Sequence, residues 1–221
     1  MPVTTHRLQF PLSAEDARRL RAGDQVIIDG EIIVTAGLPT HQRLLACVEG
    51  GQGGEALPMA LHGQTLFHIG SYSQESADGF EVLYINPTTS TRFNPYMPRL
   101  IEALALHAVG GKGGLDAASA AAMQRTGCVY LSFLGGGCTL LSAAVREVLE
   151  VGWTEMLTHY RVVRLRVEGL GPVTVAIDAH GHSLYADAAQ QARLSLPALM
   201  AELDADRLGS PDLATTSPPQ A

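Results

Sequence analysis

A run rich in β-branched residues, from Gln25 to Val34, most constrains the fold of this chain. It reads Gln-Val-Ile-Ile-Asp-Gly-Glu-Ile-Ile-Val, with Asp29-Gly30 in the middle. β-branched residues favour strands, and an Asp-Gly pair between two such runs is typical of a tight hairpin. The run therefore predicts two strands joined by a turn. Two later apolar runs, Thr65 to Ile69 and Phe80 to Ile85, predict further strands.

The rest of the chain alternates helix and strand patterns. Helices are expected after Ser13, from Thr40 to Val48, after Asn94-Pro95 with Asn94 as cap, after Asp116, and from about Thr139 to Leu149. Strands are expected from Cys128 to Leu134 and, as a pair, from Val162 to Val167 and from Val173 to Asp178, with a turn at His180-Gly181-His182. The sum is an α/β domain with a mixed sheet and helices packed on it. We expect one domain over residues 1–205 and a flexible tail over 206–221, where Ser, Thr and Pro dominate from Gly209 on.

Composition narrows the class of protein. Among the 221 residues, 15 are Lys or Arg and 22 are Asp or Glu, giving a net charge of −7. A protein that binds phosphate backbones normally carries the opposite sign, so we expect no nucleic acid and no membrane as partners. Cys47, Cys128 and Cys138 show neither disulfide nor metal-ligand spacing, and nothing near the N-terminus is typical of a signal peptide. A cytoplasmic protein is the expectation.

The segment from Asn86 to Arg92 is the first candidate for chemistry. It reads Asn-Pro-Thr-Thr-Ser-Thr-Arg, so four hydroxyls and a guanidinium precede a predicted helix start. Free backbone N–H groups at a helix N-terminus and an arginine together suit a carboxylate or phosphate. A polar loop with a capping role is the alternative, because such clusters are common in loops.

Lys112 is the second candidate. It is the one lysine among the 15 cations and lies in Gly110-Gly111-Lys112-Gly113-Gly114. Glycines let a backbone approach a ligand, and lysine supplies a compact point charge for an anion. The loop is not a phosphate-binding Walker motif, because Gly113 stands where Ser or Thr is needed. A flexible turn with a solvated lysine is the alternative.

Other candidates carry less weight. His41 near a helix start is either an acid/base or a capping side chain, and the sequence leaves this open. His180 and His182 suit a metal less well than a polar turn. Cys128 and Cys138 bracket one strand, but an iron–sulfur cluster needs three or four thiolates.

Four ordered segments together resemble the C-terminal domain of class I fumarases, which in L-tartrate dehydratase is a separate beta subunit. They are 87–92, 111–114, Gly135-Gly136 and 178–184. The resemblance extends from Leu12 to about Leu184. It implies a swivelling β/β/α domain and a hydro-lyase that reversibly dehydrates a small hydroxy (di)carboxylic acid.

The resemblance also implies residue roles and partners. Thr88 matches a catalytic hydroxyl, and Arg92 and Lys112 match residues that hold substrate carboxylates. Thr89 and Ser90 lie beside them as further substrate-binding candidates, and His41 is a second catalytic candidate. The family uses a [4Fe-4S] cluster, and this chain offers no metal ligands for it. We therefore expect an alpha-type partner subunit that holds the cluster, in a heterodimer or heterotetramer.

Departures from the family pattern leave alternatives. Where the pattern has Arg-Asp-Ala-Ala-His, this chain has Gly37-Leu38-Pro39-Thr40-His41, so a second substrate-binding arginine is missing. Either the substrate differs or the activity is lost. A diverged, non-catalytic carboxylate-binding or assembly subunit is thus the main alternative, and a standalone enzyme that uses Cys128 and Cys138 is a third.

Overall fold

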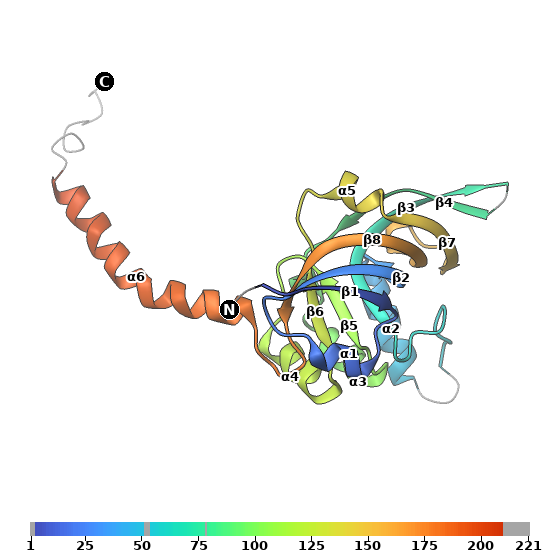
Figure 1. Ribbon diagram of the computed structural model, residues 1–221, viewed down its shortest axis with the longest axis horizontal. Coiled ribbons are helices and arrows are strands. Elements are labelled where there is room, and N and C mark those ends of the chain that lie inside the picture. Colours follow the sequence, from blue (N-terminus) through green and yellow to red (C-terminus); the bar gives the residue numbers. More distant parts are fainter. Residues whose placement is uncertain (1–2, 51–53, 78, 210–221) are drawn as a thin grey trace, which may run out of the picture. The chain divides into compact units, whose positions relative to one another are not determined.

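The computed structural model describes residues 3–50, 54–77 and 79–209. Within these residues eight strands form one sheet, in the order β1-β2-β3-β5-β6-β8-β7, with β4 paired to β3 (Figure 1). The strands are β1 (Thr5–Phe10), β2 (Gln25–Thr35), β3 (Thr65–Ser76), β4 (Gly79–Pro87), β5 (Ala108–Gly111), β6 (Val129–Ser132), β7 (Val145–Gly152) and β8 (Val162–Ile177). Parallel and antiparallel pairs are mixed, which confirms the predicted class.

The sheet closes on itself. β2 pairs in parallel with β3 at Ile33↔Leu66 and antiparallel with β8 at Ile32↔Leu165, so β2, β3, β5, β6 and β8 form a ring. Alternate side chains of these strands point inward and build the core, in which Val34, Phe67 and Leu131 are fully buried. Strands β5 and β6 end side by side at Gly111 and Ser132, whereas β3 continues past them to Ser76. β4 returns along β3 to Pro87, which pairs with Ile69 close to the end of β5.

The predicted hairpin at Asp29-Gly30 is wrong, because β2 runs unbroken from Gln25 to Thr35. Gly30 has a φ of +101°, and the pairing with β8 shifts register on both sides of Ile28. A glycine at positive φ inside a strand is typical of a bulge, which bends the strand without reversing it. The bend lets one strand pair with β1, β3 and β8.

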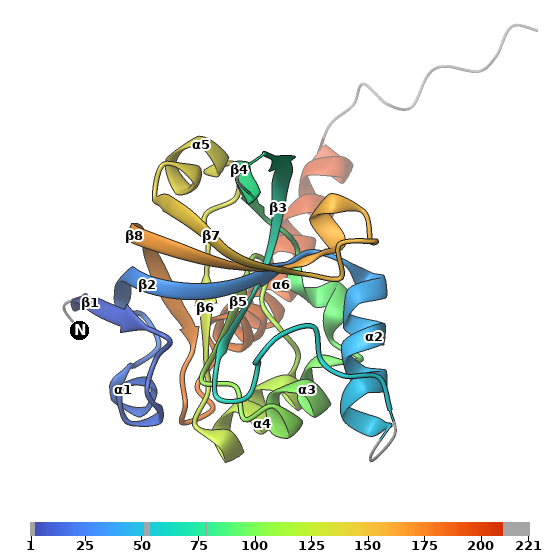
Figure 2. The same ribbon diagram turned by 90° about the vertical axis from the view of Figure 1, so that its right-hand side faces the viewer.

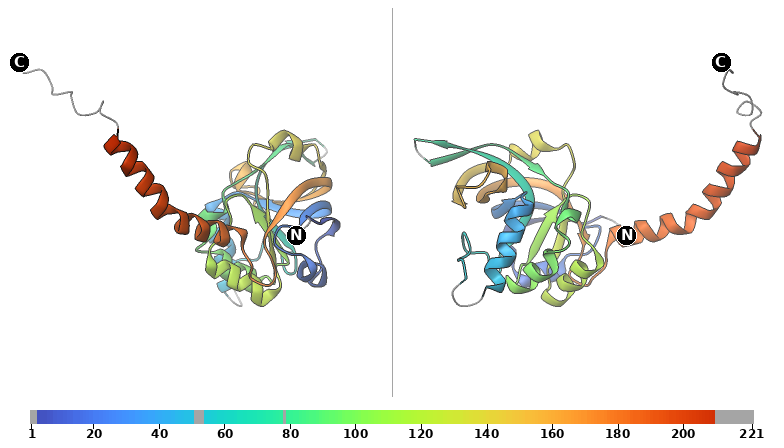
Figure 3. Two further views of the ribbon diagram at one scale, coloured as in Figure 1. Left: turned by 60° about the vertical axis from the view of Figure 1, so that its left-hand side comes forward. Right: turned by 180° about the vertical axis from the view of Figure 1, so that it is seen from behind.

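Four helices gather at one side of the sheet and a short one lies at the other (Figures 1, 2 and 3). The first group is α1 (Ala14–Arg19), α2 (Leu38–Glu49), α3 (Met97–Ala103) and α4 (Ala117–Thr126); the short helix is α5 (Cys138–Ser142), next to β4. Helices α1 and α4 begin after Ser13 and Asp116 as predicted, and the side chains of these two residues cap them. Asn94 does not cap α3; its Oδ1 accepts the N–H of Asp116 at 3.2 Å.

The predicted helix over 139–149 is wrong beyond Ser142, because residues from Val145 on form the edge strand β7. Register shifts lie between Val145 and Glu147 and between Val148 and Glu150. Each bulge adds one residue to the period, so valines recur every three residues and imitate a helical spacing. The predicted strand pair over 162–178 is likewise one strand, β8, which bends near Gly169 and Gly171.

The chain divides into two units, Met1–Leu184 and Tyr185–Ala221. Described residues of the second unit form α6 (Leu184–Gly209), which contains Pro197. The predicted domain end at residue 205 falls inside this helix. The predicted tail from residue 210 onward lies outside the described residues. Among the helices described, none is long and apolar enough to cross a membrane.

Candidate functional site

The two segments singled out in the sequence lie against each other. Thr88 donates its N–H to the carbonyl of His68 at 2.8 Å and accepts the N–H of Lys112 at 3.0 Å. The N–H of Ser90 returns to the carbonyl of Lys112 at 2.8 Å. Thr89 and Lys112 thus form a short parallel bridge. The structure therefore brings residues 88–90 and Lys112 into one site.

The sheet explains why these loops meet. β4 delivers Thr88 directly after Pro87, and β5 delivers Lys112 directly after Gly111, while β3 lies between these strands and pairs with both. A Cβ at Gly111 would collide with Ser90 Oγ and lie 3.0 Å from His68 Cβ, so glycine is needed for the close approach. After the bridge, the turn η1 (Ser90–Phe93) carries Arg92.

The charged and hydroxyl side chains of the site remain accessible. Arg92 is exposed, and Thr88, Thr89 and Lys112 are half-buried. Arg92 Nη2 donates to Thr88 Oγ1, and Nε to the Thr89 carbonyl at 3.4 Å. Across the described residues, neither Arg92 nor Lys112 forms an ion pair with a carboxylate. A guanidinium at the Thr88 hydroxyl, with Lys112 paired to the same segment through its backbone, offers groups that can hold an added carboxylate.

Lys112 also approaches the third glycine segment. A Cβ built on Gly135 would lie 3.7 Å from Lys112 Cδ, so the lysine stem passes beside this residue. Gly135 and Gly136 follow β6 and are exposed. Three of the four segments that carry the family resemblance thus lie close together. The fourth segment, around Asp178, forms the predicted turn, in which Asp178 Oδ1 accepts the N–H groups of His180 and His182.

Ser90 points into the core. Its side chain is fully buried, and Oγ lies 2.8 Å from His68 Nδ1 and 2.7 Å from Tyr130 Oη. The Ser90 hydroxyl therefore faces the interior, in contrast to the accessible Thr88 and Thr89. Sequence reasoning missed His68 and Tyr130. The available signal was a histidine inside the apolar run Thr65 to Ile69.

His41 is also fully buried. Its Nδ1 donates to the Gly37 carbonyl at 2.6 Å, and its ring stacks on Phe93 with centroids 3.9 Å apart. Burial lowers the pKa of His41 to about 4 and the pKa of His68 well below its usual range, so both rings are neutral at pH 7. Their Nε2 atoms have no hydrogen-bond partner in the described structure. The structure thus places His41 behind Phe93, at the start of α2.

Comparison with known proteins places the chain in a family. The family model described as "Fumarase C-terminus" matches residues 3–188, which include every candidate site residue. The chain belongs to the fumarase C-terminal family. It is 30% identical over 180 residues to the L(+)-tartrate dehydratase subunit beta of Escherichia coli strain K12, covering 81% of this chain and 86% of that protein. The protein of the same name from Shigella boydii serotype 4 is 29% identical over the same shares.

The cysteines of this fumarase C-terminal domain do not converge. Cys47 lies on α2, Cys138 starts α5, and Cys128 is fully buried where desolvation raises its thiol pKa. In the part of the chain that the structure describes, no three His, Cys, Asp or Glu side chains are grouped to hold a metal ion. An iron–sulfur cluster therefore does not fit the described residues of this chain.

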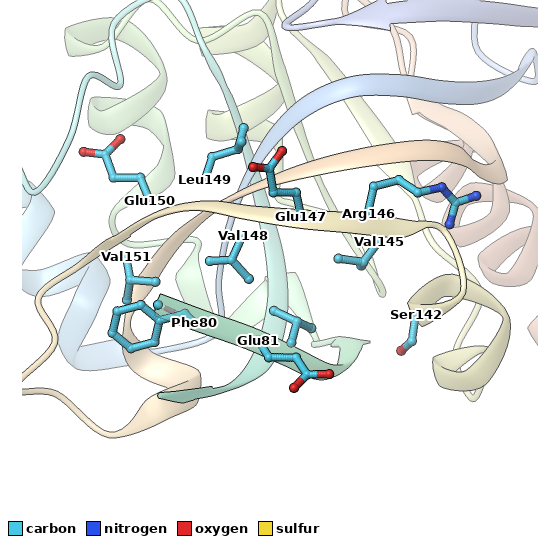
Figure 4. Close-up of a pocket in the computed structure, with 12 residues that line it drawn as sticks. Phe80, Glu81, Ser142, Val145, Arg146, Glu147, Val148, Leu149, Glu150 and Val151 are labelled. Carbon is cyan, nitrogen blue, oxygen red and sulfur yellow. The ribbon is translucent and has the colours of Figure 1, made fainter. Parts of the chain in front are cut away.

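A groove of about 680 Å³ lies away from the candidate site of this family member, between β4 and β7. Its lining residues are Gly79, Phe80, Glu81, Val82, Ser142 and 145–151. Figure 4 shows Val148 and Val151 pointing toward β4 while Glu147 and Glu150 point away. Glu147 and Glu150 are paired with Arg166 and Arg164 of β8. The groove thus lies between two strands and is lined by valines and by polar and charged side chains, none of which is a predicted site residue.

Proposed function

We propose that this chain is the beta subunit of an iron–sulfur hydro-lyase that dehydrates a small hydroxy (di)carboxylic acid reversibly. The observation that carries the proposal is the backbone pairing of Thr88 with Lys112, which joins the segments that contain Thr88, Arg92 and Lys112 on a fumarase C-terminal domain. The names of the relatives, L(+)-tartrate dehydratase subunit beta, support the same reaction class.

Lys112 and Arg92 are assigned to the substrate carboxylate. No carboxylate among the described residues forms an ion pair with either of them, and a charge-assisted hydrogen bond to a carboxylate contributes about 1.5–3 kcal/mol. Thr89 supplies a further hydroxyl at the same edge. Ser90 supports them from inside, because its Oγ is turned away from solvent.

Thr88 is assigned the proton movement. Dehydration removes a proton from the carbon next to the one that loses its hydroxyl, and a positioned side chain must hold or transfer that proton. The guanidinium of Arg92 donates to Thr88 Oγ1 and would stabilise Thr88 as an alkoxide. The hydroxyl first gives its own proton to water, and the alkoxide then takes the substrate proton and becomes the neutral hydroxyl again. Because His41 is fully buried and its ring stacks on Phe93, we assign it to holding Phe93 and the turn η1 in place of the catalytic role expected from the sequence.

The proposal requires a partner. A [4Fe-4S] cluster supplies the Lewis acid for the leaving hydroxyl in this family, and the described residues of this chain offer no ligands for it. We therefore assign the cluster to an alpha-type subunit, in a heterodimer or heterotetramer. The ring-shaped sheet is assigned to the swivelling β/β/α class, in which the domain turns as a body toward that partner.

The test is reconstitution with an alpha-type subunit encoded beside this chain. The anaerobic complex should dehydrate one or more of malate-, tartrate- and citramalate-like acids, and Thr88→Val should lower kcat at least about 100-fold while the cluster content stays the same. Thr91→Val is the matched control, since Thr91 is exposed on the same turn. A fully loaded complex with no turnover on any of these acids would refute the proposal.

One observation favours a second candidate, a non-catalytic carboxylate-binding subunit. Tyr160 fills the space beside Gly37, where the family pattern has an arginine. Binding of a dicarboxylate to the full chain, lost in Lys112→Ala, together with no turnover in the loaded complex, would favour this candidate.

A further inference from the structure

We infer that a buried hydrogen-bond chain, His68–Ser90–Tyr130, positions Thr88 against Lys112. The inference deepens the proposed function and rests on it for the catalytic role of Thr88. The chain joins strand β3, turn η1 and strand β6 through one hydroxyl. Ser90 Oγ lies 2.8 Å from His68 Nδ1 and 2.7 Å from Tyr130 Oη, and all three side chains are fully buried.

His68 holds the catalytic segment at two points. Its carbonyl accepts the Thr88 N–H at 2.8 Å, and its ring contacts the Ser90 hydroxyl two residues later. Lys112 is bonded to the same segment, through its N–H to Thr88 and through its carbonyl to Ser90. A shift of Ser90 therefore moves Thr88 relative to Lys112, because these residues share one short ladder.

The hydrogen bonds of the chain have a direction. His68 is neutral, and its Nε2 has no partner, whereas its Nδ1 faces Ser90 Oγ. A buried N–H without an acceptor costs more than an unused lone pair, so the proton lies on Nδ1 and is donated to Ser90 Oγ. The Ser90 O–H is then free to donate to Tyr130 Oη. Replacing Ser90 by alanine removes the acceptor of this His68 N–H within the described residues.

The three residues hold Thr88 in place and do not contact the substrate themselves. None of the three side chains is exposed, whereas Thr88 and Lys112 are half-buried and Arg92 is exposed. Gly111 leaves the room for this arrangement, since a Cβ there would collide with Ser90 Oγ. A displacement of about 1 Å at a reacting group lowers a rate about 100-fold, so a small shift of the ladder is enough to matter.

The first test uses the loaded complex. Ser90→Ala and Tyr130→Phe should each lower kcat about 10- to 100-fold, while KM changes less than about threefold because Lys112 is anchored by its own strand. His68→Asn, which keeps a donor at the Nδ1 position, should retain kcat within about threefold, and His68→Leu should not. Ser73→Ala is the matched control: Ser73 is buried on the same strand, but its Oγ has no partner.

The second test separates this inference from the proposed function. In the full chain alone, hydrogen exchange at the amides of Thr88, Ser90 and Lys112 should quicken at least about tenfold in Ser90→Ala and Tyr130→Phe and stay unchanged in Ser73→Ala. An inactive wild-type complex would refute the proposed function. The hydrogen-exchange rates of the full chain would still show whether His68, Ser90 and Tyr130 position Thr88. Unchanged exchange in both variants, or wild-type kcat in an active Ser90→Ala complex, would overturn the inference.

Discussion

Tyr160 occupies the space that a side chain at residue 37 would need. A Cβ built on Gly37 lies 3.0 Å from both Cβ and Cδ1 of Tyr160 and collides with Thr40 Oγ1. The Tyr160 carbonyl is fixed in turn by the hydroxyls of Thr35 and Thr40. The glycine that interrupts the family pattern is therefore matched by an aromatic side chain packed against it, so the two positions form a unit.

Gly37→Arg should consequently destabilise the protein by about 1–3 kcal/mol, because the new side chain meets a closed surface. Replacing Tyr160 by alanine in the same chain should recover part of that loss, which a double-mutant cycle of urea unfolding would measure. Leu38→Arg is the control, since Leu38 is 43% exposed and begins the same helix. Additive effects of the two substitutions would contradict the packing argument.

Lys112→Ala should raise KM about 10- to 100-fold in the complex, because the variant loses one charge-assisted hydrogen bond to the substrate carboxylate. Lys112→Arg should fail to restore binding, because the lysine stem passes 3.7 Å from the Cβ position of Gly135 and a planar guanidinium needs more width. Arg99→Ala removes an exposed cation 3.9 Å from Glu49 and should leave KM unchanged. Recovery of wild-type KM by arginine would argue against a specific ammonium site.

The error at β7 shows what local pattern cannot supply. Val145, Val148 and Val151 have the spacing of a helix face, and only pairing with β8 reveals that bulges create this spacing. The wrong hairpin prediction in β2 has the same origin. An Asp-Gly pair suits a turn or a bulge equally well, and the pairing with neighbouring strands decides between them. The predicted helix starts after Ser13 and Asp116 are confirmed, and each of these side chains accepts an N–H in the first turn of its helix, whereas the predicted Asn94 cap is wrong.

Some residues of the candidate site could likewise be predicted from the local sequence, and others could not. Residue types at Thr88, Arg92 and Lys112 predicted anion binding, and the structure brings their segments together. His68 and Tyr130 carried no such signal, because their link through Ser90 exists only when β3, β5 and β6 are aligned. Hydroxyl and imidazole groups inside apolar strands are better read as parts of a network once the strand order is known.

Two glycines near Lys112 should respond differently to alanine. A Cβ at Gly111 would collide with Ser90 Oγ and lie 3.1 Å from the Thr88 carbonyl, whereas a Cβ at Gly135 meets only ordinary contact with Lys112. Gly111→Ala should lower the free energy of unfolding by about 1–3 kcal/mol. Gly135→Ala should change it by less than about 0.5 kcal/mol. Urea unfolding of both variants measures this, and equal effects would show that the two loops do not approach as described.

Acid should weaken the fold through the buried histidines. The pKa of His41 is about 4 in the folded protein against 6.5 for an ordinary histidine, so the unfolded chain binds more protons between these values. The contribution of neutral His41 is complete above pH 6.5 and is lost as the pH falls toward 4, at about 1.4 kcal/mol per pH unit and about 3 kcal/mol in all. His68, with its pKa also lowered by burial, acts in the same direction.

The measurement is the free energy of unfolding in urea at pH 7, 6 and 5, for the wild type and for His41→Asn. Asparagine keeps a donor for the Gly37 carbonyl but does not titrate, so the variant should lose stability between pH 6 and pH 5 about half as steeply as the wild type, with His68 supplying the rest. The comparison uses slopes, because the smaller side chain also leaves a cavity that lowers stability at every pH. Carboxylates whose pKa is lowered by arginine, such as Asp29 and Glu55, titrate below this window and affect both proteins alike. Identical slopes would mean that His41 is already protonated in the folded state or reaches solvent there.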